Sequence, residues 1–540
     1  MKNKFIKSFS IVVLVLFSTS CAKTLDRKPF YDVTSAAVYD NFSNYKSILA
    51  KLYAGLAVSG QQGPSGRPDI FGLDEGFSSY LRQYWQLQEL ASDEAVIGWN
   101  DGTIKDLHNM TWTPANEFIR MMYDRIFYQV SLCNEFIRET TDDKLAERKI
   151  AGADLAEAKK YHSEARFLRA LSYYHAIDMF GNVPFVLETD PIGSFFPSQI
   201  KRADLFNWLE TELKSLETLL TPARQNEYGR ADQGAVWMVL AKLYLNAEVY
   251  TTTKTSPGTK KFAECLTYCN KLIGAGYTLA SQYRYNFLAD NNTSPELIFS
   301  VNFDGLRTKS WGAMTYLIHA PVGGNMTPAL WGINGGWAGL RTTKAIVNLF
   351  PSTTGTPDSR GIFHTSGQNL EIVDLSSFND GYPITKYKNL TASGAKGSDP
   401  DGNFPDTDFP LFRLADVYLM YAECVLATGA DKNTAVGYIN ALRQRAYGNT
   451  SGNITTIDLT YDFLLKERAR ELNWEAHRRQ DLIRFEKYPG LAGFYTGSAY
   501  VWPWKGGVAG GAGVGTHRTI YPIPATDIGA NPNLVQNDDY

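Results

Sequence analysis

Apolar residues recur at helical spacing through two long parts of the chain. Between residues 154 and 180 they fall three or four positions apart, which places them on one face of a helix. Asp154 and Glu157 fit a capping box at the start of this segment. The same pattern predicts further helices over residues 204–216, with Asp204 as the N-cap, and over 232–250, 261–273, 411–428, 433–447 and 460–486.

Three of these segments share a pattern of small and aromatic residues: Ala170-Tyr173-Ala176, Ala241-Tyr244-Ala247 and, less closely, Ala415-Tyr418-Ala422. Small side chains let two helices approach closely while the aromatic ring fills the groove between them. The pattern resembles the first helix of tetratricopeptide hairpins. Because the three copies are irregularly spaced, we expect pairs of helices with long insertions rather than a tandem array.

The pattern changes between about residues 278 and 410. Gly, Asn, Pro, Ser and Thr interrupt short β-like runs, such as the run over residues 296–302. Long ordered loops on a rigid scaffold are where binding sites tend to lie. We therefore expect a mostly α fold in which helix pairs support a loop-rich ligand face with small β elements.

The N-terminus has the features of a secretory signal. Three lysines precede an apolar run over residues 11–17, which is too short to cross ~30 Å of hydrocarbon as a helix. Small residues follow, and then Cys21, which has three interpretations: half of a disulfide, a buried thiol or a point of lipid attachment. The arrangement resembles a bacterial lipoprotein signal and favours the third. Two or more acyl chains hold a protein stably at a membrane.

Composition limits the possible partners. The chain has 53 Lys and Arg against 56 Asp and Glu, a formal net charge of −3, and no basic stripe, so we expect no nucleic-acid partner. The 31 Tyr and 11 Trp suit both a large core and a carbohydrate surface. The other cysteines lie in apolar, helix-like sequence, so we expect buried free thiols: Cys133, Cys265, Cys269 and Cys424.

No constellation of residues indicates catalysis. The seven histidines form no HExxH motif, and there is no GxSxG nucleophile elbow. The acid pairs Asp74-Glu75 and Asp93-Glu94 supply the residue type that glycosidases use, but such pairs are commonplace in loops. The Gly-rich stretch 506–515 follows no strand and opens no helix, so we expect a loop rather than a phosphate cradle.

Residues 467–486 are dense with charge at helical spacing, as in the pairs Arg468/Glu471 and Glu475/Arg479. The pattern predicts an amphipathic helix with ion pairs along one flank. Each such pair contributes a few tenths of a kcal/mol.

Four stretches in a fixed order resemble the SusD/RagB family: EARFLRALSYYHAIDMFGNVPFV (164–186), PLFRLADVYLMYAECVLATG (410–429), ERARELNWEAHRRQDLIRF (467–485) and YPIPATDIGANPNLVQNDDY (521–540). The resemblance implies a surface glycan-binding lipoprotein that covers a SusC-like, TonB-dependent porin, passes oligosaccharides to it and is not an enzyme. It also implies a signal peptide over residues 1–20 and one SusD-like domain over 21–540. That domain would have a helical scaffold over about 40–277 and 411–490 and a variable region over about 278–410.

The stretches DEGFSSYLR (74–82), ELASDEAVIGW (89–99), MTYL (314–317), NGGW (334–337) and WPWKGG (502–507) resemble the ligand loops of starch-binding members. The resemblance implies an aromatic platform of Trp99, Trp337 and Tyr316, with polar contacts from Asp74 and Arg82. Pyranose rings stack on aromatic faces, while Arg donates to hydroxyls and Asp accepts from them.

The chain departs from those members at two positions of the site, which hold Ile97 and Gly102. Asn100 or Asp101 is the nearest replacement for an asparagine missing at residue 102. The loop that carries calcium in the starch-binding members is DNNTSPE here, residues 290–296, so we assign no metal or other cofactor.

The prediction is an outer-membrane lipoprotein, anchored through Cys21 and facing the cell exterior, that captures α-glucan such as starch or maltooligosaccharide. Alternatives are the same role for another glycan such as dextran or fructan, a glycoside hydrolase, and a porin lid without a ligand of its own. Plain core packing is the alternative for each platform ring. For Arg82 the alternative is a structural ion pair with Asp74 or Glu75.

Overall fold

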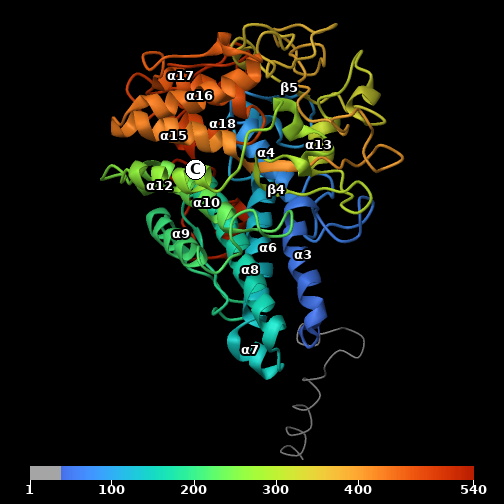
Figure 1. Ribbon diagram of the computed structural model, residues 1–540, viewed down its shortest axis with the longest axis vertical. Helices are drawn as coiled ribbons and strands as arrows, with labels where there is room; N and C mark the ends of the chain where they lie inside the picture. Colours follow the sequence, from blue (N-terminus) through green and yellow to red (C-terminus); the bar gives the residue numbers. More distant parts are fainter. Residues whose placement is uncertain (1–37) are drawn as a thin grey trace, which may run out of the picture.

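The computed structural model describes residues 38–540, and most of its regular structure is helical (Figure 1). The longer helices are α3 (Tyr45–Ala57), α4 (Tyr80–Glu89), α6 (Glu117–Glu139), α8 (Gly152–Met179), α9 (Arg202–Leu216), α10 (Gln233–Leu245), α12 (Phe262–Gly274), α15 (Leu414–Thr428), α16 (Lys432–Tyr447), α17 (Tyr461–Leu472) and α18 (Arg478–Phe485). Shorter ones are α5 (Lys105–Asn109), α7 (Asp142–Glu147), α11 (Ala247–Thr251), α13 (Ala313–His319), α14 (Lys344–Val347) and α19 (Ala525–Ala530). The prediction of a mostly α fold is confirmed.

The strands are short and form three antiparallel pairs: β1 (Val96–Ile97) with β5 (Leu340–Arg341), β2 (Val183–Pro184) with β3 (Gln199–Ile200), and β4 (Leu297–Val301) with β6 (Phe409–Arg413). β4 lies where the run 296–302 predicts a strand. The loops that follow it gather around α13, at the upper right of Figure 1, while α15, α16 and α17 lie at the upper left. The predicted arrangement of a loop-rich face beside a helical scaffold is thus confirmed.

The helices associate in pairs. α8 packs against α6 and α9, α10 packs against α12, and α15 packs against α12 and α16. The small and aromatic residues of the shared pattern lie in these contacts: Ala170, Tyr173 and Ala176 of α8 are fully buried. The close packing that this pattern predicts is confirmed.

Several helix boundaries differ from the prediction. α8 begins at Gly152 with Ala151 as its N-cap, so Asp154 lies in the first turn and the capping box does not form. Asp204 likewise lies inside the first turn of α9. There a carboxylate still interacts favourably with the helix dipole. Asp232 does cap α10, accepting a hydrogen bond from the Ala235 N–H at 3.2 Å, but the segment 232–250 divides at Asn246 into α10 and α11.

The single helix predicted over residues 460–486 is wrong, because the chain leaves the helical conformation between α17 and α18. Trp474 and Ala476 have φ values of 62° and 63°, in the left-handed region. Tertiary contacts hold this break. The Trp474 N–H donates to Glu94 Oε2 at 2.7 Å, and its carbonyl accepts from the Trp85 indole at 3.0 Å.

Most charged side chains of this segment are buried, and neither of the two predicted pairs, Arg468/Glu471 and Glu475/Arg479, forms, although Arg470 pairs with Glu467 and Arg484 with Asp481 at the predicted spacing. Arg468 pairs with Asp416 at 3.0 Å and Asp481 at 2.7 Å instead of Glu471. Glu471 and Glu475 belong to a buried set of ion pairs that we call the charge network: Glu296, Arg360, Lys386, Arg413, Arg445, Glu467, Glu471 and Glu475.

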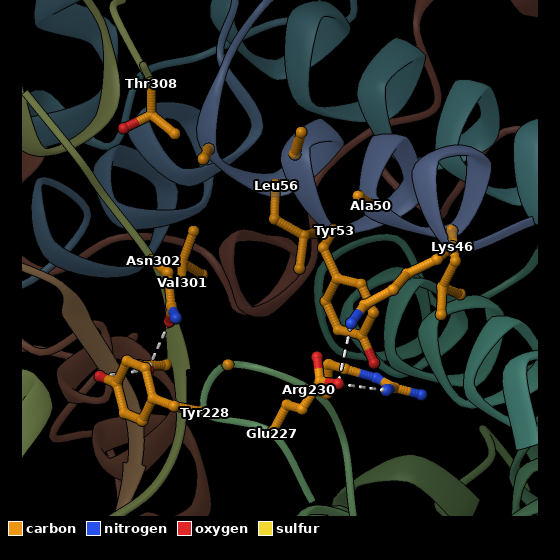
Figure 2. A pocket seen from close by; sticks show the side chains of 15 residues that line it. Lys46, Ala50, Tyr53, Leu56, Glu227, Tyr228, Arg230, Val301, Asn302 and Thr308 are labelled. Atoms are coloured by element: carbon orange, nitrogen blue, oxygen red, sulfur yellow. Dashed lines mark hydrogen bonds and ion pairs between the residues drawn. The ribbon is translucent and has the colours of Figure 1, made fainter. Parts of the chain in front are cut away.

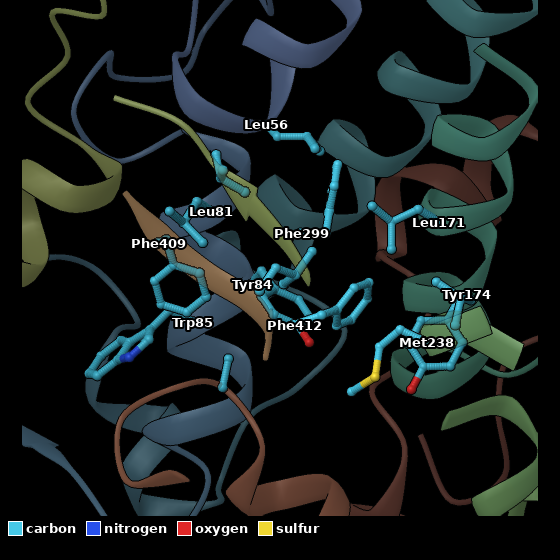
Figure 3. Packing of buried hydrophobic residues seen from close by; sticks show 14 of the residues in the cluster. Leu56, Leu81, Tyr84, Trp85, Leu171, Tyr174, Met238, Phe299, Phe409 and Phe412 are labelled. Atoms are coloured by element: carbon cyan, nitrogen blue, oxygen red, sulfur yellow. The ribbon is translucent and has the colours of Figure 1, made fainter. Parts of the chain in front are cut away.

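The β4–β6 pair crosses the centre of the core. Figure 3 shows Phe299 of β4 and Phe412 of β6 between Tyr84 of α4 on one side and Leu171 of α8 on the other. All four side chains are buried. The pair joins the helical scaffold to the loop-rich face, because β4 begins that face and β6 ends it.

Two buried carboxyl groups, Glu89 and Glu94, give stability a pH dependence. Burial raises the pKa of Glu89 to about 7, and burial together with the neighbouring Glu89 raises the pKa of Glu94 well above its ordinary value. The pair therefore stabilises the fold below the unfolded pKa of about 4.5, and this contribution is lost as pH rises through about 7. The loss is up to about 1.4 kcal/mol per pH unit for each proton.

We expect Glu94→Gln to gain stability relative to the wild type between pH 5 and pH 8, as measured by urea unfolding. The readout is the difference in the free energy of unfolding between the two proteins at each pH. Stability of either protein alone also depends on other groups: burial lowers the pKa of His108 and of His175 to about 3, which makes stability rise with pH. A constant difference across this range would contradict the assignment.

All four cysteines of the described part are buried and free, as predicted: Cys133, Cys265, Cys269 and Cys424. Within residues 38–540 no helix is long and apolar enough to span a membrane. In the same range no cluster of three or more His, Cys, Asp or Glu side chains has the arrangement of a metal site.

Candidate functional site

The short β1–β5 pair brings two distant tryptophans together. Val96 pairs with Arg341 and Ile97 with Leu340, so Trp99, just after β1, meets Trp337, just before β5. The Trp99 indole N–H donates to the Trp337 carbonyl at 3.2 Å, and the ring centroids are 6.3 Å apart at 45°. Both rings are half-buried.

Glycine at residue 339 makes this arrangement possible. A Cβ atom at Gly339 would lie 2.3 Å from the Trp99 ring, so no side chain fits there. The Gly98 N–H also donates to the Gly339 carbonyl at 2.9 Å, which extends the β1–β5 pair toward the rings.

The two tryptophans line an open pocket of about 330 Å³, which we call the tryptophan pocket. Its lining residues come from five separate segments: Pro64, Asp74, Glu75, Gly76, Phe77, Arg82, Trp99, Trp311 and Trp337. Trp311 lies 6.3 Å from Trp337 at 56° and 4.9 Å from Phe404. Three indole rings set at angles to one another therefore form a curved, partly exposed aromatic surface.

Trp337 is held rigidly from behind. Its ring stacks on His319 at 4.8 Å and 27°, and its N–H donates to the His319 carbonyl at 2.9 Å. The two nitrogens of the His319 ring lie 2.7 Å from the Gly335 carbonyl and 2.9 Å from that of Asn403. Burial lowers the pKa of His319, and the contacts of its ring with the two carbonyl groups oppose this shift. The glycine-flanked loop that carries Trp337 is thus fixed before any ligand arrives.

Arg82 lies at the floor of the pocket, and two of its hydrogen-bond donors are unpaired in the described part of the chain. It is 3% exposed, and its guanidinium stacks 4.0 Å from the Tyr316 ring and 4.3 Å from the Phe77 ring. Nη1 donates to the Gly76 carbonyl at 2.8 Å, while Nε and Nη2 are buried and have no partner among the residues that the structure describes. Burial lowers the pKa of Arg82 to about 10, so the group stays charged at neutral pH.

The acidic residues beside Arg82 do not form ion pairs with it within residues 38–540. Glu75 accepts hydrogen bonds from the Ser59 hydroxyl at 2.8 Å and the Trp311 N–H at 3.0 Å. Asp74 is exposed at the edge of the pocket and accepts from the Phe77 N–H at 3.1 Å through Oδ1 alone. A buried cation with unpaired donors and an exposed carboxylate suit a ligand rich in hydroxyl groups.

Two predicted site residues lie outside the tryptophan pocket. Tyr316 is fully buried beneath Arg82 and Trp99, so in this structure its ring supports the site from below and presents no face to a ligand. The stretch 314–317 is part of helix α13 rather than a loop, and this turns Tyr316 inward. Asn100 is exposed but does not line the pocket.

Trp311 is a lining residue that the sequence analysis missed. Its position beside Gly312 parallels that of Trp337 after Gly336, and this similarity was the available signal.

The two positions at which the site departs from starch-binding members, Ile97 and Gly102, have structural causes. Ile97 is buried in β1, and Gly102 has φ 43° with the Glu117 carboxylate 1.4 Å from any Cβ atom built there.

A scaffold of helix pairs that displays an open aromatic pocket is suited to stacking against sugar rings. The chain belongs to the SusD family, whose members are cell-surface glycan-binding proteins and not enzymes. The model of the SusD family matches residues 369–540. The chain is 32% identical to the starch-binding protein SusD of Bacteroides thetaiotaomicron, over the full length of both.

Other relatives are more distant. The SusD-like protein P25 of Formosa agariphila is 24% identical, over 99% of this chain and 98% of that protein. A crystal structure of a SusD superfamily protein from Bacteroides thetaiotaomicron has a TM-score of 0.69 at 19% identity, covering 92% of this chain and 99% of that one. A laminarin-binding SusD-like protein has a TM-score of 0.66, also at 19% identity, with the same coverage. At these identities the structures show the fold alone.

Proposed function

We propose that the protein binds α-glucan, as starch or maltooligosaccharide, in the tryptophan pocket. The observation that carries the proposal is the combination of the three indole rings with Arg82 beneath them, whose buried Nε and Nη2 donors are unpaired. Glucose rings present C–H faces to stack on the indoles and hydroxyl groups to accept from the guanidinium. The similarity to a relative named for starch binding supports the choice of glycan.

The expected affinity is modest. Three stacked rings at about 1–1.5 kcal/mol each and two hydrogen bonds at about 1 kcal/mol each give roughly 5–7 kcal/mol. This corresponds to a Kd between about 10 μM and several hundred μM. Weak binding suits a capture protein, because several sites along a polymer add avidity and each unit is released quickly.

The same proposal places the protein at the outer membrane, facing the exterior, anchored by lipid on Cys21 after removal of residues 1–20. Cys21 lies outside the described residues. From there the protein hands the glucan to a TonB-dependent, SusC-like porin. The lipoprotein-like signal and the family membership support this part of the proposal.

Another glycan is the second candidate. The site departs from starch-binding members at Ile97, which is buried in β1, and at Gly102, whose φ is positive and where a side chain would displace the Glu117 carboxylate. A protein of the same fold is named for laminarin binding. The glycan preference therefore needs a direct comparison.

We expect the protein lacking residues 1–21 to be retarded in native gels that contain amylopectin, and not in gels that contain dextran, levan or no glycan. Stacking of helical α-1,4-glucan on a curved aromatic surface is the physical reason. Retardation by dextran or levan alone would keep the carbohydrate-binding role and reject the starch assignment. Equal mobility in all gels would reject glycan binding by the isolated protein.

A further inference from the structure

A second open groove, which we call the Tyr228 groove, lies between α3, the loop 226–230 and β4 (Figure 2). Its volume is about 400 Å³. Its floor is apolar and is formed by Leu49, Tyr53, Leu56 and Val301. In Figure 2, Tyr228 and Asn302 lie on one side of the groove, and Lys46 and Arg230 lie on the other.

Tyr228 presents a fixed aromatic ring in this groove. The residue is 50% exposed, although its hydroxyl is anchored in the protein. That hydroxyl donates to Asp408 Oδ2 at 2.5 Å and lies 3.1 Å from the Ser300 hydroxyl, and both partners are buried. Two further hollows, of about 200 and 510 Å³, are also lined by Tyr228. An aromatic ring that is anchored through its hydroxyl and borders three hollows is preorganised for contact with a flat apolar ligand face.

The rim of the groove is polar without excess charge. Lys46 pairs with Glu227 at 2.8 Å, and Arg230 lies 3.6 Å from the same carboxylate. Asn302 accepts a hydrogen bond from the Ser300 hydroxyl at 2.7 Å, while its amide nitrogen has no hydrogen bond within residues 38–540. An apolar floor with paired charges and an unpaired amide donor at the edge matches a sugar ring, which has apolar faces and a hydroxyl-bearing rim.

The Tyr228 groove and the tryptophan pocket are joined by a short segment of the chain. Thr308 lines the groove, and Trp311, three residues later, lines the pocket. Three residues span at most about 11 Å. A second link runs through Glu75 of the pocket, which accepts hydrogen bonds from Ser59, just beyond α3, and from Trp311. One polymer chain can therefore reach both.

We infer that the Tyr228 groove is a second glycan subsite, which takes the units of a long α-glucan that extend beyond the tryptophan pocket. The inference rests on the proposed function. It makes Tyr228 the stacking residue of this subsite and Asn302 its hydrogen-bond donor. A short oligosaccharide occupies the tryptophan pocket alone, whereas a long one contacts both sites.

The test is isothermal titration calorimetry of maltotriose and of a ten-unit maltooligosaccharide against the wild type, Tyr228→Ala and Tyr228→Phe. We expect Tyr228→Ala to bind maltotriose as the wild type does and to bind the long chain about five- to tenfold more weakly. Tyr228→Phe is the matched control. It also loses the hydrogen bond to Asp408 but keeps the ring, so we expect it to bind the long chain within about twofold of the wild type.

Long chains offer several registers and gain affinity for statistical reasons, so the comparison is between variants at one chain length. Equal affinity of the wild type and Tyr228→Ala for the long chain, with normal maltotriose binding, would overturn the subsite and leave the proposed function intact. An equal loss in both Tyr228 variants would assign the effect to Asp408 and also overturn the subsite. Failure of the wild type to bind either oligosaccharide would overturn the α-glucan assignment and the subsite together.

Discussion

Replacing Trp337 by alanine is expected to weaken maltoheptaose binding by roughly 10- to 100-fold, as measured by calorimetry. Trp337 is the central ring of the aromatic surface, with Trp99 and Trp311 each 6.3 Å away. The change removes one stacking face and leaves Trp99 and Trp311 without the ring that lies between them. Central aromatic residues of this kind carry a large share of binding energy. Because the starting affinity is modest, the loss will bring retardation in amylopectin gels close to zero.

Trp337→Phe is the matched control, because it keeps an aromatic face against His319. We expect it to retain measurable binding, and we expect both variants to unfold cooperatively near the wild-type temperature. Wild-type affinity in Trp337→Ala would contradict the assignment of the site. A loss of cooperative unfolding in that variant would require the same test with Trp99→Ala.

Replacing Arg413 by methionine is expected to lower the free energy of unfolding by about 3–5 kcal/mol. Arg413 is 1% exposed and pairs with Glu296 at 2.8 Å, Glu471 at 2.7 Å and Glu475 at 2.5 Å. Burial opposes ionisation of Glu471, but the guanidinium groups of Arg445 and Arg413 overcome it and hold the pKa of Glu471 well below its usual range. Loss of one cation leaves buried carboxylates without full compensation.

Urea unfolding at pH 7 measures this change, and Lys466→Ala provides the control. Lys466 pairs with Asp462 at 2.7 Å, but both side chains are about half exposed. Exposed pairs contribute little, so we expect a change below about 0.5 kcal/mol. A similar, small effect for Arg413→Met would show that the charge network contributes little to stability.

The sequence predicts those parts of the fold that depend on local pattern. The helices over residues 261–273 and 433–447 agree with α12 and α16 to within one residue at each end. The break between α17 and α18 could not be predicted, because it depends on Trp85 and Glu94, nearly 400 residues away in the chain. The direction of the charged side chains also depends on distant partners, such as Arg413 for Glu471.

Part of the candidate site could likewise be predicted from the sequence, and part depends on the tertiary fold. The family resemblance assigns Trp99 and Trp337 to one site, and the β1–β5 pair brings them together. Tyr316 was assigned to an exposed platform, but the helical conformation of α13 turns it beneath Arg82. The neighbouring Gly312 is only a weak local signal for Trp311, because the place of this residue in the pocket depends on the fold of the loop after β4.

A crystal structure of the protein with maltoheptaose bound tests the central claim most directly. We predict glucose rings stacked on the faces of the three indoles of the tryptophan pocket, with a sugar hydroxyl about 3 Å from the Arg82 guanidinium. Maltoheptaose bound elsewhere, with the tryptophan pocket empty, would contradict the claim.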